Sequence, residues 1–198
     1  MFNLYKGGFG AVESKGARYP DEKQTLMQTF KYDSELWENH QTLNVEGGVD
    51  GNALETKLAS YNNTPFSKIC LGMTVNSDGS SINWIGIEYE ASSFYSLLAD
   101  GMFKTVNVGK SKWESLVDDS KLPNNCEYEG FNTRLASNPT QKRVRIGYLA
   151  QKTCGQEEGL IGFGTDLNGL RWSSGYIYPS RTGNGAKEIS AFGYIYVR

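Results

Sequence analysis

Two neighbouring segments in the middle of the chain show the alternation of apolar and polar residues that is typical of half-buried β-strands. Every second residue of segment 69–75 is apolar, and residues 82–89 form a second apolar-rich segment. Residues 76–80 lie between them and contain the pair Asp78-Gly79, which favours a tight turn between antiparallel strands. The pattern therefore predicts a β-hairpin.

Other short apolar segments predict further strands. Their positions are 2–5, 25–30, 144–149, 160–164, 176–178 and 189–197, the last being one terminal strand. Basic and apolar residues alternate over residues 142–146, as they do in an edge strand. Glycines inside the predicted strands indicate bulges or the close approach of neighbouring elements. These glycines are Gly86, Gly147, Gly162 and Gly193.

Short helices are predicted at three places. Residues 33–37 form one or two helical turns with Asp33 or Ser34 as the cap, and residues 94–98 follow Ser92 or Ser93, either of which can cap a helix. Residues 111–114 match a capping box, in which Ser111 would accept from the third amide while Glu114 reaches back.

These elements predict a mainly β fold: a sandwich-like single domain with two or three short helices. The chain has 198 residues, of which 38% are hydrophobic and 21% charged, as in an ordinary folded protein. We expect residues 1–65 to form an N-terminal extension that packs on a core module of residues 66–198.

The amino-acid composition excludes most of the common catalytic mechanisms. The chain contains one histidine, His40, and three cysteines that lie far apart. A nucleophile–histidine relay or a structural zinc site therefore lacks its usual groups. The net charge of −2 argues against a nucleic-acid partner, and no apolar stretch approaches the length of a transmembrane helix. Binding or structural roles are favoured over catalysis.

One Gly-flanked segment near the C-terminus combines hydrogen-bonding groups with aromatic rings. It contains Asp166, Asn168, Arg171, Trp172 and Tyr176. Sugars are bound by this mixture, because a ring face packs on an aromatic side chain while polar groups satisfy the hydroxyls. These five residues are the predicted ligand-binding site.

The same segment has two other interpretations. Asp166 and Asn168 begin an Asp-x-Asn-Gly sequence, which opens many calcium loops, so calcium is a candidate ion. Alternatively, Asn168-Gly169 is only a type I′ hairpin turn and Trp172 belongs to the core.

Tyrosines alternate in the last predicted strands. Tyr194 and Tyr196 form one pair, and Tyr176 and Tyr178 form another. The residues between them are not cleanly polar, so packing against a second layer is the main expectation. An aromatic platform for a ligand is the other interpretation.

The paired carboxylates Glu127/Glu129 and Glu157/Glu158 could in principle catalyse glycoside hydrolysis. Adjacent carboxylates in Gly-flanked loops are usually solvated charge, which is the interpretation adopted here. His40 lies in a polar segment and is expected to be exposed.

Ten short segments spread along most of the chain are shared with one group of known sequences. They are residues 5–12, 69–73, 91–101, 108–110, 113–116, 125–126, 129–132, 145–147, 161–164 and 191–195. Together they resemble a module of secreted cnidarian proteins, found in uncharacterised skeletal organic matrix proteins of stony corals and in stand-alone relatives. The resemblance implies secretion and an extracellular or matrix setting. It implies no activity and no catalytic residues.

The chain departs from these relatives in its cysteines. The relatives tend to carry more of them, around Cys154 and in the loop before the last strand, where this chain has residues 182–185. A bridge found in the relatives therefore does not transfer directly, and Cys126 with Cys154 is the preferred pairing.

Composition and resemblance together predict a secreted, non-catalytic binding protein that recognises carbohydrate or an extracellular-matrix component, as lectins do. A structural matrix protein that assembles into homo-oligomers is the first alternative. A membrane-active toxin or a cofactor-free enzyme is the second.

Overall fold

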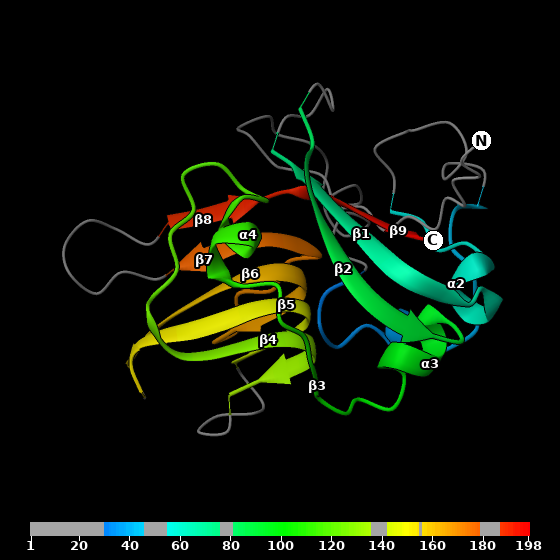
Figure 1. Ribbon diagram of the computed structural model, residues 1–198, viewed down its shortest axis with the longest axis horizontal. Helices are drawn as coiled ribbons and strands as arrows, with labels where there is room; N and C mark the ends of the chain where they lie inside the picture. The colour runs from blue at the N-terminus through cyan, green and yellow to red at the C-terminus, as the bar shows by residue number, and fades with distance from the viewer. Residues whose placement is uncertain (1–29, 46–54, 76–80, 136–141, 155, 179–186) are drawn as a thin grey trace.

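Two antiparallel β-sheets, one of three strands and one of six, form the layers of the structure (Figure 1). This computed structural model describes residues 30–45, 55–75, 81–135, 142–154, 156–178 and 187–198. Its elements are η1 (Glu35–Trp37), α2 (Ser60–Asn63), β1 (Phe66–Thr74), β2 (Asn83–Ala91), α3 (Phe94–Leu98), β3 (Lys104–Thr105), α4 (Lys110–Glu114), β4 (Asn125–Arg134), β5 (Lys142–Thr153), β6 (Gln156–Leu167), β7 (Ser174–Tyr178), β8 (Lys187–Ser190) and β9 (Phe192–Val197). The predicted mainly β, sandwich-like single domain with short helices is confirmed.

The smaller sheet has the order β2-β1-β9. Strands β1 and β2 form the predicted antiparallel hairpin, with Leu71 opposite Ile85; its expected turn, 76–80, lies outside the described residues. The side chains of Ile69, Leu71 and Met73 are fully buried between the sheets. Because side chains alternate along a strand, the residues between them face outward.

The larger sheet has the order β3-β4-β5-β6-β7-β8. Strand β5 contains the basic residues predicted to mark an edge, but it pairs with β4 on one side and β6 on the other. The edge prediction is therefore wrong. The arginines of β5 are instead neutralised within the fold, as Arg143 is by Asp166. Strand β4 was not predicted as a strand.

The predicted terminal strand is two strands. Strand β8 pairs with β7 in the larger sheet, while β9 pairs with β1 in the smaller one. The chain changes sheets at Ala191, whose carbonyl accepts a hydrogen bond of 2.7 Å from the Ser174 hydroxyl. Figure 1 shows β8 and β9 diverging at this point. A continuous run of apolar residues does not reveal such a crossing.

The helix predictions hold at two positions. Ser34 caps η1 by accepting from the Leu36 amide. Ser93 caps α3, and its partner in a reciprocal capping box is Ser96. Segment 33–37 and segment 94–98 were therefore identified correctly from local capping signals.

The predicted capping box at residues 111–114 is wrong, although a helix forms there. Helix α4 begins one residue earlier, after Gly109, which has a φ of 88°. Glu114 does not reach back to Ser111; its carboxylate accepts from the Leu122 amide at 2.7 Å. Its partner thus comes from the chain that follows the helix.

The described part of the N-terminal segment is fixed to the larger sheet. Trp37 is fully buried in the core. Arg145, 4% exposed, donates to the Tyr32 carbonyl at 2.7 Å and to Glu38 Oε1 at 2.6 Å. The predicted strand at 2–5 and residues 25–29 of the strand predicted at 25–30 lie outside the described residues.

Candidate functional site

The predicted ligand segment contains a two-residue hairpin turn. Asn168 and Gly169 have φ values of 54° and 90°, as a type I′ turn requires. The flanking Leu167 and Leu170 exchange backbone hydrogen bonds of 2.9 and 3.0 Å. The turn interpretation of this sequence is confirmed.

The Asp166 carboxylate is occupied by cationic side chains of the protein. Asp166 is 1% exposed. Its Oδ2 lies 2.9 Å from Arg143 Nη2 and 3.2 Å from Arg171 Nε, and its Oδ1 accepts from the Gly169 amide at 3.2 Å. Within the described ranges, no cluster of three His, Cys, Asp or Glu side chains is arranged to hold a metal ion.

Trp172 and Tyr176 do not share a surface. Tyr176 is buried in the core between the sheets, and its hydroxyl donates to the Lys121 carbonyl at 2.6 Å. Trp172 packs on a second cluster that contains Leu160 and Ile177, on the other face of the larger sheet. The five predicted side chains are therefore not brought together into one site.

A continuous aromatic surface lies on the outward face of the smaller sheet. Trp84 of β2 and Tyr194 of β9 both pair with Gly72 of β1. One row further along, Tyr196 is paired with Cys70. Small residues in the middle strand thus lie between large aromatic residues on the two outer strands. We call Trp84, Tyr194 and Tyr196 the aromatic face.

The rings of the aromatic face are in mutual contact. The Trp84 centroid lies 5.4 Å from that of Tyr196 and 5.9 Å from that of Tyr194. Trp84 is 45% exposed, and its ring covers Gly72, where a Cβ would come within 2.5 Å of it. Glycine at position 72 therefore allows the indole to lie flat across the central strand. Partial burial raises the pKa of both tyrosines.

Charged side chains border one end of the aromatic face. Lys68 of β1 and Glu88 of β2 are cross-strand partners and form an ion pair of 2.5 Å. Arg198 adjoins Lys68, and the two residues exchange backbone hydrogen bonds. The surface therefore combines stackable rings with hydrogen-bonding groups.

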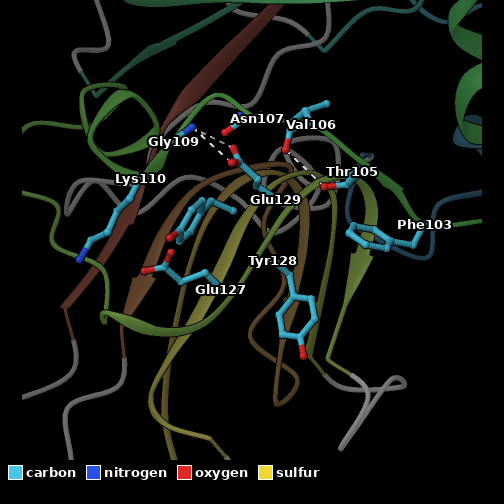
Figure 2. Close-up of a pocket in the computed structure, with 10 residues that line it drawn as sticks. Phe103, Thr105, Val106, Asn107, Gly109, Lys110, Glu127, Tyr128 and Glu129 are labelled. Atoms are coloured by element: carbon cyan, nitrogen blue, oxygen red, sulfur yellow. Dashed lines mark hydrogen bonds between the residues drawn. The ribbon is translucent and has the colours of Figure 1, made fainter.

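A separate polar cavity of about 380 Å³ lies where β3, α4 and β4 meet (Figure 2). Its walls include Asn107, Lys110, Glu127, Glu129 and Tyr148. Figure 2 shows Tyr128 pointing away from the two glutamates, consistent with its packing on the other face of the sheet. The carboxylate pair considered from the sequence thus lines a real cavity.

The two carboxylates of this cavity have different environments. Glu129 accepts from the amides of Val108 and Gly109 at 3.1 Å each and from the Trp113 indole at 2.7 Å. It therefore holds the loop before α4 against the sheet. Glu127 is exposed.

The remaining sequence candidates have ordinary surroundings. His40 is exposed, as predicted, and its ring lies 3.9 Å from that of Tyr95. The interpretation as solvated charge is wrong for Glu158, which lies in β6, is buried and pairs with Lys142.

Two of the three cysteines are joined. Cys126 and Cys154 form a disulfide with a Cα–Cα distance of 5.6 Å, the pairing preferred from the sequence. Cys70 is a free cysteine on the outward face of β1.

Comparison with known proteins gives no match among family models, curated proteins or solved structures. No helix in the described parts of the chain is long and apolar enough to cross a membrane.

Proposed function

We propose that this protein is a secreted, non-catalytic binding protein that recognises carbohydrate or an extracellular-matrix glycan through its aromatic face. The observation that carries the proposal is the contact of the exposed Trp84 ring with the half-buried rings of Tyr194 and Tyr196. Soluble monomeric proteins seldom expose large contiguous apolar patches unless these bind a partner. Three rings in contact on one sheet form such a surface.

The chemistry of a pyranose ring suits this surface. One face of the sugar presents C–H groups, which pack against the electron-rich face of an indole or phenol. The sugar hydroxyls need donors and acceptors beside the rings. Tyrosine hydroxyls, together with Lys68 and Glu88 at one end of the aromatic face, supply both. Shape and stacking therefore suffice for recognition without a catalytic group.

An extracellular setting is supported by the disulfide between Cys126 and Cys154, because such bonds persist mainly in oxidising compartments. The resemblance to coral matrix proteins points to the same setting. Asp166 is fully engaged by arginines, so the proposed recognition does not depend on calcium at that position.

A second candidate function, self-assembly into a matrix, rests on the same exposed rings. Strand β2 is an edge of the smaller sheet as described, and Trp84 projects from it. A second copy could cover the aromatic face and form a homo-oligomer. Concentration-dependent oligomers without any saccharide binding would favour this function.

A glycan array tests the proposal. Wild-type protein should bind a subset of glycans equally with and without calcium. Trp84→Ala should weaken that binding by about 1–3 kcal/mol, through lost stacking and buried area. Trp84→Phe, which keeps an aromatic ring, should retain part of it, and Arg171→Ala in the 166–176 segment is the matched control. Wild-type binding by Trp84→Ala would contradict the proposed site.

A further inference from the structure

The smaller sheet ends in a long strand that has a neighbour on one side only. Strand β2 is an edge of the order β2-β1-β9 and has nine residues (Figure 1). The edge strands of the larger sheet, β3 and β8, have two and four residues, and β9 has six. Edge strands are usually kept short, because their unpaired N–H and C=O groups can pair with another chain. The length of β2 makes it a candidate docking edge.

The outer side of β2 is unpaired within the described residues. The ladder partners of β2 all belong to β1, and the described backbone hydrogen bonds of loops, turns and caps include none from residues 83–91. Pairing with β1 is regular from Asn83 to Glu88, and the one register shift lies beyond Glu88. The strand contains no proline. An extended chain can therefore form a ladder along residues 83–88.

Acidic side chains stand along this edge. Glu88 and Glu90 are exposed, and the side chain of Glu88 is 76% exposed although Lys68 of β1 pairs with it. Directly opposed side chains of neighbouring strands lie about 4.5–5.5 Å apart, and like charges at that separation are destabilising. An incoming strand should therefore carry basic residues beside the two glutamates.

We propose that β2 pairs with an extended basic segment of a partner protein, which adds a strand to the three-stranded sheet. Backbone hydrogen bonds give such pairing its affinity, and alternate side chains give it specificity. In an antiparallel arrangement, two basic residues at alternate positions reach Glu90 and Glu88, and an apolar residue four positions later lies beside the Trp84 ring. This contact uses the edge of the sheet, whereas the proposed glycan binding uses its outward face.

A second copy of the protein suits this edge less well. Antiparallel pairing of two β2 strands would bring Glu88 and Glu90 of both copies to one edge, and β2 contains no basic residue to neutralise them. The net charge of −2 on each chain acts in the same direction. Charge complementarity therefore favours a basic partner over self-association.

The blocked peptide Lys-Thr-Lys-Thr-Val-Thr-Phe is the probe. Its titration into the full-length protein should shift the backbone amide signals of residues 83–88 and leave those of β8 in place. The same peptide with glutamate in place of both lysines should not bind, and equal binding of the two peptides would overturn the proposal. Shifts of the β2 signals with protein concentration alone would assign the edge to a second copy and also overturn it.

Two N-methylated peptides test the backbone pairing. In an antiparallel ladder, alternate residues of a strand direct their N–H groups to a given neighbour. One peptide is methylated on the amides of its odd-numbered residues and the other on those of its even-numbered residues. One of them should lose binding while the other keeps it. An equal effect of the two methylation patterns would show that the peptide does not bind as a strand.

Variants of β2 test the charge assignment. The double variant Glu88→Gln with Glu90→Gln should bind the basic peptide about fivefold more weakly, the loss of two exposed ion pairs, and this difference should shrink at high salt. Glu188→Gln, at an exposed position of the edge strand β8, is the matched control and should bind as wild type does. Wild-type affinity in the double variant would refute the proposal. Failure of the peptide to bind, with glycan binding intact, would overturn this inference alone.

Discussion

At the scale of single residues, buried or half-buried charged groups in this protein mostly hold segments together. Glu129 shows this most clearly, since its carboxylate accepts from the Val108 and Gly109 amides and the Trp113 indole. Trp113 is fully buried, so its N–H has no route to water. The role of Glu129 is therefore to position the loop and helix that form the cavity.

Replacement of Glu129 should destabilise the protein. Glu129→Ala leaves three donors without their acceptor, and we expect a loss of about 2–3 kcal/mol in the free energy of unfolding. Glu129→Gln keeps one carbonyl oxygen and should lose less. Glu188→Ala, at an exposed position on β8, should stay within about 0.5 kcal/mol of wild type. Chemical denaturation measures all three variants, and equal effects at positions 188 and 129 would contradict the assigned role.

At the scale of elements, strands β5 and β6 approach closely at a pair of facing glycines, Gly147 and Gly162. A Cβ at Gly147 would overlap the backbone carbonyl oxygen of Ile161. The close approach predicted from these glycines is thus present, and it lies at the centre of the larger sheet.

Gly147→Ala should therefore destabilise the protein by at least about 2 kcal/mol, because backbone rather than a flexible side chain must move. Gly86→Ala is the matched control. Its Cβ would lie 3.2 Å from the Lys68 side chain, which can give way. Thermal unfolding compares the two variants. Similar melting temperatures would show that β5 and β6 can move apart without loss of stability, which would contradict the prediction.

Elements with strong local signals could be predicted from the sequence, and elements defined by distant contacts could not. The β1–β2 hairpin and α3 have clear alternation, turn or capping residues. Strand β4 begins with an irregularity at Cys126, whose φ is 46°, and lacks clean alternation. The crossing at Ala191 depends on which sheet each half of the segment joins.

The candidate site shows the same division. Asp166 is a ligand candidate from the sequence alone, because its ion-pair partner Arg143 lies 23 residues away along the chain. The aromatic face combines residues from β2 and β9, which become neighbours only because β1 lies between them. Alternating tyrosines at 194 and 196 indicated an aromatic platform as one interpretation, but nothing local linked them to Trp84.

At the scale of the whole molecule, buried tyrosines make folding sensitive to alkaline pH. Burial raises the pKa of Tyr61 and Tyr148 above the ordinary value of 10.0. Their contribution is complete below pH 10.0 and is lost above it, because only the unfolded chain then releases these protons. Lys57 acts in the opposite sense, since burial lowers its pKa from 10.5 to about 8. The cost of burying the charged Lys57 ammonium therefore falls as the pH rises from about 8 to 10.5, and this change stabilises the folded protein.

The free energy of unfolding should therefore fall above about pH 10, by about 1.4 kcal/mol per pH unit for each tyrosine that stays protonated. Urea unfolding at a series of pH values measures this slope. Tyr148→Phe should reduce the magnitude of this slope by about 1.4 kcal/mol per pH unit, the contribution of one tyrosine. A slope unchanged in that variant would contradict the burial of the Tyr148 hydroxyl.

The central claim is that carbohydrate binds on the outward face of the smaller sheet. The indole N–H spectrum tests it most directly, because Trp37, Trp84, Trp113 and Trp172 report on the core, the aromatic face, the cavity and the 166–176 segment. Titration with a glycan selected on the array should shift the Trp84 signal first and leave the Trp172 signal unmoved. A shift of Trp172 while Trp84 stays fixed would contradict the account.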